Sequence, residues 1–257
     1  MLPKQPNKSL IDGVACLQGV ASQKEFIGVS ELSKLLDLEQ TKVHRLLRTL
    51  MYLGFIQQNS SRKYGPGPGI YTLAAQTLYA SHFIRDAYRP LEELRTRQPA
   101  LVAMGVVWNR SVSLLYHADG STPFEEAVGT FGTWPASDSG IGMAVMADLP
   151  NDEIRQLYAE HEVEHCFGGV EELLERLDRV KKQGYAFVKT HGKLKRSTLA
   201  VRLNSNPLVG VGLSAQMNKD ELLRYLPMLQ ETAEAIDANA MRNSTEPEHA
   251  MDGQPAV

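Results

Sequence analysis

One stretch constrains the fold more than any other: residues 28–53, which read GVSELSKLLDLEQTKVHRLLRTLMYL. A first short helix is predicted there, with Ser30 as its N-cap. A second helix is predicted from Gln40, and its apolar residues recur at i, i+3, i+4 and i+7, the spacing of one buried stripe: Val43, Leu46, Leu47 and Leu50. Two short helices joined by a tight turn indicate a helix-turn-helix.

The outer face of the predicted second helix carries cations and short hydrogen-bonding side chains: Gln40, Thr41, Lys42, His44, Arg45, Arg48 and Thr49. A helix-turn-helix places such a face in the major groove of DNA, with its N-terminal residues near base edges. A solvated helical hairpin is the alternative that this motif alone leaves open.

The residues that follow decide between these alternatives. Residues 54–58 alternate loosely, residues 59–61 can turn, and Arg62 and Lys63 come at and after the tip. This pattern predicts the basic wing of a winged helix, placed to meet phosphates. We expect two or three base readers among Gln40, Thr41, Lys42, His44 and Arg45, and we expect Arg48 to meet phosphate.

The distribution of charge agrees with a DNA-binding first domain. Residues 1–68 hold nine Lys or Arg and five Asp or Glu, whereas the remainder holds 18 and 25, within a net charge of −3. No apolar run reaches the ~20 residues of a membrane span, and the first residues lack a signal-peptide core. Cys16 and Cys166 are the two cysteines, so a disulfide framework is not indicated. We therefore expect a cytoplasmic protein without a membrane partner.

The rest of the chain predicts an α+β domain, in which helices pack on a sheet. A domain boundary is predicted at the Pro-Gly stretch 66–69, followed by helices over 70–82 and 88–98 that Pro90 separates. Strands are predicted over 101–108, 111–117, 124–130, 184–189, 198–204 and 208–215. Helices are predicted over 138–147, 152–160, 170–183 and 219–241.

Several motifs resemble the IclR family of bacterial transcriptional regulators over nearly the whole chain. LSKLLDLEQTKVHRLLRTLMYLGFI is similar to the family's helix-turn-helix pattern, and AVGTFGTWPASDSGIGMAVMA and GYAFVKTHGKLKRSTLAVRL to two stretches of its second domain. Met143, His191 and Lys195 depart from that pattern. The resemblance implies a GAF-like effector-binding domain and dimers, or dimers of dimers, on a palindromic operator.

The expected domains are a winged helix-turn-helix over 1–68, a linker helix over 69–87, a GAF-like effector-binding and oligomerisation domain over 88–245 and a disordered tail over 246–257. An effector site is expected at seven residues: Ser137, Ser139, Gly140, Ile141, Met143, Thr198 and Ser214. A glycine-containing segment entering a helix offers backbone amides to a carboxylate, although a simply N-capped helix with close packing is the alternative. Four residues could form an apolar wall or ordinary core: Phe131, Trp134, Val106 and Leu114.

Two further groups of residues carry weaker signals. A basic run at Lys189, His191, Lys193, Lys195 and Arg196 could hold an acidic effector, but a solvated loop is favoured. His161, His165 and Cys166 lack a fourth ligand, so no metal is expected.

The leading interpretation is a ligand-responsive transcription factor without catalysis or cofactor, which senses a small organic acid. The alternatives are an enzyme with an appended DNA-binding module and a DNA-binding protein whose second domain only dimerises. No G-x-S-x-G elbow or phosphate-binding loop supports the enzyme.

Overall fold

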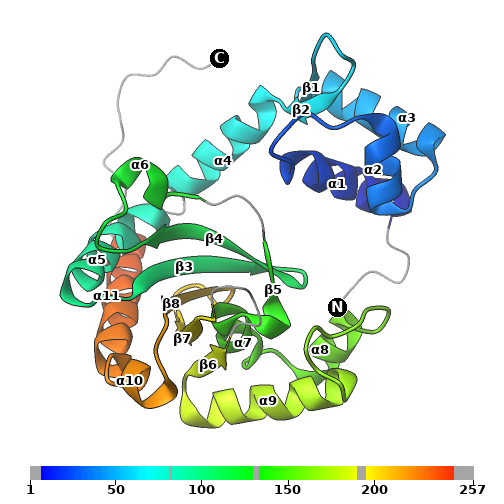
Figure 1. Ribbon diagram of the computed structural model, residues 1–257. Helices are drawn as coiled ribbons and strands as arrows, with labels where there is room; N and C mark the ends of the chain where they lie inside the picture. The colour runs from blue at the N-terminus through cyan, green and yellow to red at the C-terminus, as the bar shows by residue number, and fades with distance from the viewer. Residues whose placement is uncertain (1–6, 81–82, 130–132, 190–194, 246–257) are drawn as a thin grey trace, which may run out of the picture. The chain divides into compact units, whose positions relative to one another are not determined.

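The computed structural model describes residues 7–80, 83–129, 133–189 and 195–245 (Figure 1). Contacts divide the chain into two compact units, Met1–Ser81 and His82–Val257. The predicted tail over 246–257 lies outside the described residues. Among those described, no helix is long and apolar enough to cross a membrane.

The first unit has the predicted helix-turn-helix and wing. Its elements are α1 (Lys8–Ala21), α2 (Val29–Leu36), α3 (Gln40–Tyr52), β1 (Ile56–Gln58), β2 (Tyr64–Pro66) and α4 (Pro68–Ala80). β1 and β2 pair antiparallel. A small apolar core joins these elements: Cys16, Val20, Ile27, Leu32, Val43, Leu47, Ile56 and Tyr64.

Two details of this unit differ from the prediction. The N-cap of α2 is Gly28 rather than Ser30, because the Glu31 carboxylate accepts a hydrogen bond from the Gly28 amide at 2.8 Å. The spacing of apolar residues over 9–21 also predicts a helix with a buried face of four residues: Leu10, Val14, Leu17 and Val20 or Ala21. That face is only partly correct, because Val20 is buried but Leu10 and Val14 are 66% and 40% exposed. The other buried residues of α1 are Asp12, Cys16 and Gly19. A Cβ at Gly19 would lie 2.6 Å from Leu32 Cδ1. α1 meets α2 by close approach and not through its largest side chains.

The second unit is built on a six-stranded antiparallel sheet with the strand order β5-β4-β3-β8-β7-β6. The strands are β3 (Leu101–Trp108), β4 (Ser111–Ala118), β5 (Trp134–Pro135), β6 (Ala186–Lys189), β7 (Ser197–Arg202) and β8 (Val209–Ala215). The strand predicted over 124–130 is wrong, because Phe124–Ala127 forms the short helix α6, which begins after Pro123. Glu125, Glu126 and Ala127 favour a helix over a strand.

Helices cover both faces of the sheet (Figure 1). α5 (Phe83–Arg97) and α11 (Leu226–Thr245) lie side by side on one face, and α10 (Lys219–Leu223) precedes α11. The other face packs against α7 (Gly140–Met146), with α8 (Asn151–Leu157) and α9 (Gly169–Gln183) around it. The short 3-10 helix η1 (Ala136–Asp138) leads into α7. Gly210 in β8 lets α7 approach closely, since a Cβ there would lie 3.2 Å from Ile141 Cγ2.

Two prolines explain why helices differ from the prediction. Pro90 does not separate two helices but lies inside α5. A proline cannot donate to the carbonyl four residues earlier, and that carbonyl, of Asp86, accepts a hydrogen bond from Asn239 of α11 at 2.8 Å. The final helix, by contrast, is divided into α10 and α11, because Pro227 lacks an amide hydrogen and falls in the first turn of a new helix.

Candidate DNA interface and effector site

The recognition helix α3 presents its polar face to solvent, as predicted for five residues: Gln40, Thr41, His44, Arg45 and Arg48. On the opposite side, Val43 and Leu47 are fully buried. The turn before α3 is fixed by the Ser33 hydroxyl, which donates to the Leu38 carbonyl, and by Asp37 in the left-handed conformation, φ 50°. This turn orients α3 against α2.

Lys42 differs from the other predicted residues of α3. Its side chain is 26% exposed, and its ammonium pairs with the carboxylate of Asp12 in α1. The prediction that Lys42 points to solvent on the same face as Thr41 and Arg45 is therefore corrected, because its ammonium points toward Asp12 in α1.

The wing is a tight loop between β1 and β2. The Asn59 side-chain oxygen accepts from the amides of Ser61 and Lys63, both at 3.0 Å, so the loop is closed by its own first residue. Arg62 is exposed there with φ 58°. The Lys63 ammonium lies 3.6 Å from the Glu31 carboxylate. The pKa of Glu31 is lowered mainly by the hydrogen bond from the Gly28 amide and, to a smaller extent, by the charge of Lys63. Within the described residues no ion pair is found for Arg62 at the wing tip, whereas Lys63 behind it is partly neutralised by Glu31.

Three of the predicted effector residues come together on the sheet face that packs against α7. Thr198 in β7 is directly opposite Ser214 in β8, and the Thr198 hydroxyl donates to the Ser214 oxygen at 3.4 Å. Gly140 begins α7 above them, so close that a Cβ would lie 2.7 Å from the Thr198 methyl carbon. Gly140, Thr198 and Ser214 therefore form one polar corner.

The other four predicted effector residues are used within the protein. The Ser137 hydroxyl donates to the Glu164 carboxylate at 2.9 Å, and Ser139 caps α7 by accepting from the Gly142 amide at 3.4 Å. Ile141 and Met143 are 2% and 4% exposed and belong to the core around α7. These contacts are those of an N-capped, closely packed helix.

The predicted apolar wall is divided between the two faces of the sheet. Leu114 packs against the core around α7, but Val106 packs against the core under α5 and α11. Trp134 is 42% exposed on β5. Phe131 lies outside the described residues, as do His191 and Lys193 of the basic run, in which Lys189 and Lys195 are exposed and Arg196 is partly buried.

His117 is a residue of this face that the sequence analysis missed. It is paired with Ala103 across β3 and β4, so both side chains point toward α7, and within the part of the chain that the structure describes its buried Nδ1 has no hydrogen-bond partner. A buried polar atom without a partner is uncommon in proteins. Regular alternation along β4 would place His117 on the face opposite to Leu114. The register shift between Met104 and Gly105 leaves Leu115 unpaired, so His117 and Leu114 share a face.

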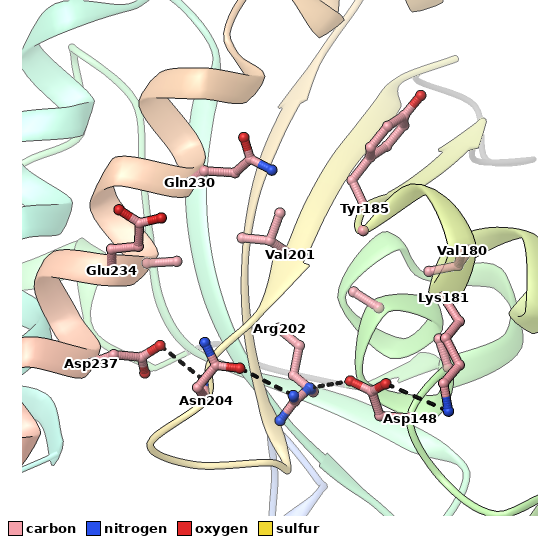
Figure 2. A pocket seen from close by; sticks show the side chains of 14 residues that line it. Asp148, Val180, Lys181, Tyr185, Val201, Arg202, Asn204, Gln230, Glu234 and Asp237 are labelled. Carbon is pink, nitrogen blue, oxygen red and sulfur yellow. Dashed lines mark hydrogen bonds and ion pairs between the residues drawn. The ribbon is translucent and has the colours of Figure 1, made fainter.

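A cavity of about 230 Å³ lies elsewhere, beside the end of β7 and between α9 and α11 (Figure 2). None of the seven predicted effector residues lines it. Arg202 and Asp148 pair at its rim: the Arg202 guanidinium donates to Asp148 at 2.6 Å and to the side chain of Asn204 at 3.2 Å. The buried Asp237 carboxylate accepts from the amides of Asn204 and Ser205, at 2.9 and 2.8 Å. This network fastens α11 to the turn after β7.

Comparison with known proteins decides what kind of molecule combines these two units. Residues 13–60 match the IclR helix-turn-helix domain, and residues 75–238 match the bacterial transcriptional regulator IclR C-terminal domain. The chain belongs to the IclR family. It is a DNA-binding transcriptional regulator with a C-terminal effector domain.

Individual relatives of this IclR-family chain are also regulators and not enzymes. It is 26% identical over 250 residues to the HTH-type transcriptional regulator KdgR of Escherichia coli (strain K12), covering 92% of this chain and 95% of that one. It is 27% identical to KdgR of Dickeya chrysanthemi, a match that covers 72% of this chain and 62% of that relative's length.

Solved structures show the same fold. An IclR-family regulator from Brucella abortus matches with a TM-score of 0.70 and 22% identity, over 95% of this chain and 94% of that one. An IclR homologue from Microbacterium hydrocarbonoxydans, in complex with 4-hydroxybenzoate, matches with a TM-score of 0.66 and 17% identity, over 91% and 100%.

Proposed function

We propose that this IclR-family regulator acts in the cytoplasm as a homodimer or homotetramer and binds a palindromic operator. In this proposal a small organic acid binds the domain over 88–245 and changes the operator affinity of the winged helices over 1–68, through the linker helix over 69–87. The contacts to DNA are made by α3 and the wing: Gln40, Thr41, His44, Arg45, Arg48, Arg62 and Lys63. Two reading heads match two half-sites, which is how helix-turn-helix dimers recognise palindromes.

The oligomer is supported by α4, the helix Pro68–Ala80 that makes up most of the proposed linker. None of its residues is buried, and its sequence, PGIYTLAAQTLYA, has no charged residue. Four of its large side chains are exposed: Tyr71, Leu73, Leu78 and Tyr79. An exposed apolar surface of this kind is typical of an interface between proteins.

The observation that carries the effector proposal is the set of polar groups on one sheet face, Thr198 and Ser214 at one side and the unpartnered His117 at the other. The apolar residues Leu101, Ala103 and Leu114 lie on the same face. An apolar floor with a few polar groups is usual for a small-molecule site. The homologue bound to 4-hydroxybenzoate supports an aromatic acid as one ligand of this class.

A thermal-shift screen of carboxylic acids that includes 4-hydroxybenzoate tests this proposal, followed by calorimetry on each acid that stabilises the protein. Thr198→Val keeps the shape of the side chain and removes its hydroxyl, so it should weaken binding about 5-fold or more, the value of one hydrogen bond. Ser113→Ala is the matched control, because Ser113 is paired with Val106, which packs on the opposite face.

Three results would count against it. Equal affinity of Thr198→Val and the parent for the acid would mean that the ligand binds elsewhere. A screen in which no acid stabilises the protein would refute the proposal that its effector is a carboxylic acid. Consumption of the acid, followed by chromatography, would indicate the enzyme alternative.

A further inference from the structure

Asp12 is an acidic residue buried in the small core of the DNA-binding unit. It lies on α1, is 5% exposed, and pairs with the Lys42 ammonium in the first turn of α3. A second cation, Lys8, lies 4.0 Å from the other carboxylate oxygen, but its side chain is 80% exposed. The fixed partner of Asp12 is therefore Lys42.

The surroundings of this pair strengthen the attraction between the two charges. Cys16, one turn after Asp12, is fully buried, and burial together with the Asp12 charge raises its pKa to about 11. Charges in such surroundings interact more strongly than in water. Removing the closely paired cation from a buried carboxylate is strongly destabilising, so the ammonium of Lys42 is held at Asp12.

Sequence-independent DNA binding depends on cationic side chains that contact the phosphates. Each phosphate that a protein neutralises contributes about −0.9 to the slope of log K against log salt concentration. A lysine at the third position of a recognition helix would ordinarily add one such contact, as Arg48 can six residues later.

We propose that Asp12 withholds Lys42 from DNA and so lowers the sequence-independent affinity of the winged helix. The inference rests on the proposed contact of α3 with DNA. Asp12 is a positioning residue here: it touches no DNA, and it leaves discrimination to the exposed residues His44 and Arg45. With less affinity for random sequence, the regulator distinguishes its operator better from the excess of competing DNA.

The test measures the affinity of the full-length protein for a mixed-sequence 30-base-pair duplex at several salt concentrations. Asp12→Asn releases Lys42, so the salt slope should steepen by about 0.9 for each bound winged helix, which corresponds to about 8-fold tighter binding at 0.1 M salt. Glu25→Gln is the matched control, because it removes one negative charge from an exposed residue of the same unit. It should change the slope by much less.

A second variant shows whether the gain comes from Lys42. Asp12→Asn combined with Lys42→Met removes both charges and should return the slope to the parent value. Thermal melting checks that each variant is folded.

The proposal is overturned if Asp12→Asn has the parent slope, or if the double variant keeps the gain. It is also overturned if Lys42→Met, when folded, lowers the slope as much as Arg48→Ala, since Lys42 would then already reach phosphate. If neither Arg45→Ala nor Arg48→Ala changes the slope, the contact of α3 with DNA itself is wrong, and this inference fails with it.

Discussion

Replacing Asp237 by Asn should destabilise the second unit, although the two side chains have the same shape. One oxygen of the buried Asp237 carboxylate accepts from the amide and the hydroxyl of Ser205, at 2.8 and 2.6 Å. The other accepts from the amide of Asn204 at 2.9 Å. The oxygen of an asparagine can keep the two bonds to Ser205, but its NH₂ group then faces the Asn204 amide, so that two donors oppose each other.

The magnitude follows from these contacts. A hydrogen bond to a charged group contributes about 1.5–3 kcal/mol, and a buried amide left without a partner costs about 1–3 kcal/mol. Because the two terms overlap, we expect a loss of about 2–4 kcal/mol. In a unit of this size, that corresponds to a fall in melting temperature of about 5–15 °C.

Urea denaturation followed by tryptophan fluorescence measures this loss selectively. The chain has two tryptophans, Trp108 and Trp134, and both belong to the second unit. Glu234→Gln is the matched control, since Glu234 is exposed on the same helix, one turn before Asp237. It should change the free energy of unfolding by less than about 0.5 kcal/mol. If Asp237→Asn is as stable as this control, the bonds from the turn after β7 do not hold α11 in place.

Three further predictions concern pH, DNA and assembly. Hydrogen bonds from Ser121, with further ones from Thr122, lower the pKa of Asp119 from 3.8 to about 2, so folding favours its charged form. That stabilisation is present above the unfolded-state pKa of 3.8 and is lost as the pH falls toward 2. In urea denaturation, Asp119→Asn should therefore have a lower free energy of unfolding than the parent at pH 7, and the difference should be smaller at pH 3. In gel-shift titration at fixed salt, Arg45→Ala should weaken operator binding by about 1–3 kcal/mol if Arg45 reads a base, and unchanged binding would remove it from the interface. Tyr71→Glu places a charge on the apolar face of α4 and should lower the oligomeric state in sedimentation, whereas a parent protein that sediments as a monomer at micromolar concentration would refute the proposed interface.

The helix-turn-helix could be predicted from sequence because local spacing determines it. The stripe of α3 that contains Val43 and Leu47 needs no knowledge of distant residues, and the two are fully buried as that spacing requires. The buried face of α1 could not be predicted in the same way. Hydrophobicity selects Leu10, but the close approach at Gly19 and the pairing of Asp12 with Lys42 depend on the positions of α2 and α3.

The effector site was less predictable because strand register determines it. Thr198 and Ser214 were expected near one another and are directly opposite in the sheet. His117 was missed because the unpaired Leu115 reverses which side chains of β4 share a face with Leu114. Val106 was misplaced for another reason: it is paired with Ser113, so it lies on the face opposite to Leu114. The position of this bulge is set by the pairing of β3 with β4, and Gly105, a glycine inside a strand at the register shift, is its mark in the sequence.

The bond between Asp86 and Asn239 also affects the order in which the chain can fold during synthesis. The carbonyl that Pro90 leaves without its helical donor is satisfied by a side chain 153 residues later in the chain. At about 5–20 residues per second, a ribosome needs about 8–30 s to cover that separation. For that time α5 exists as a nascent helix with an open carbonyl and an apolar face, so the second unit can become native only after its last helix has left the ribosome.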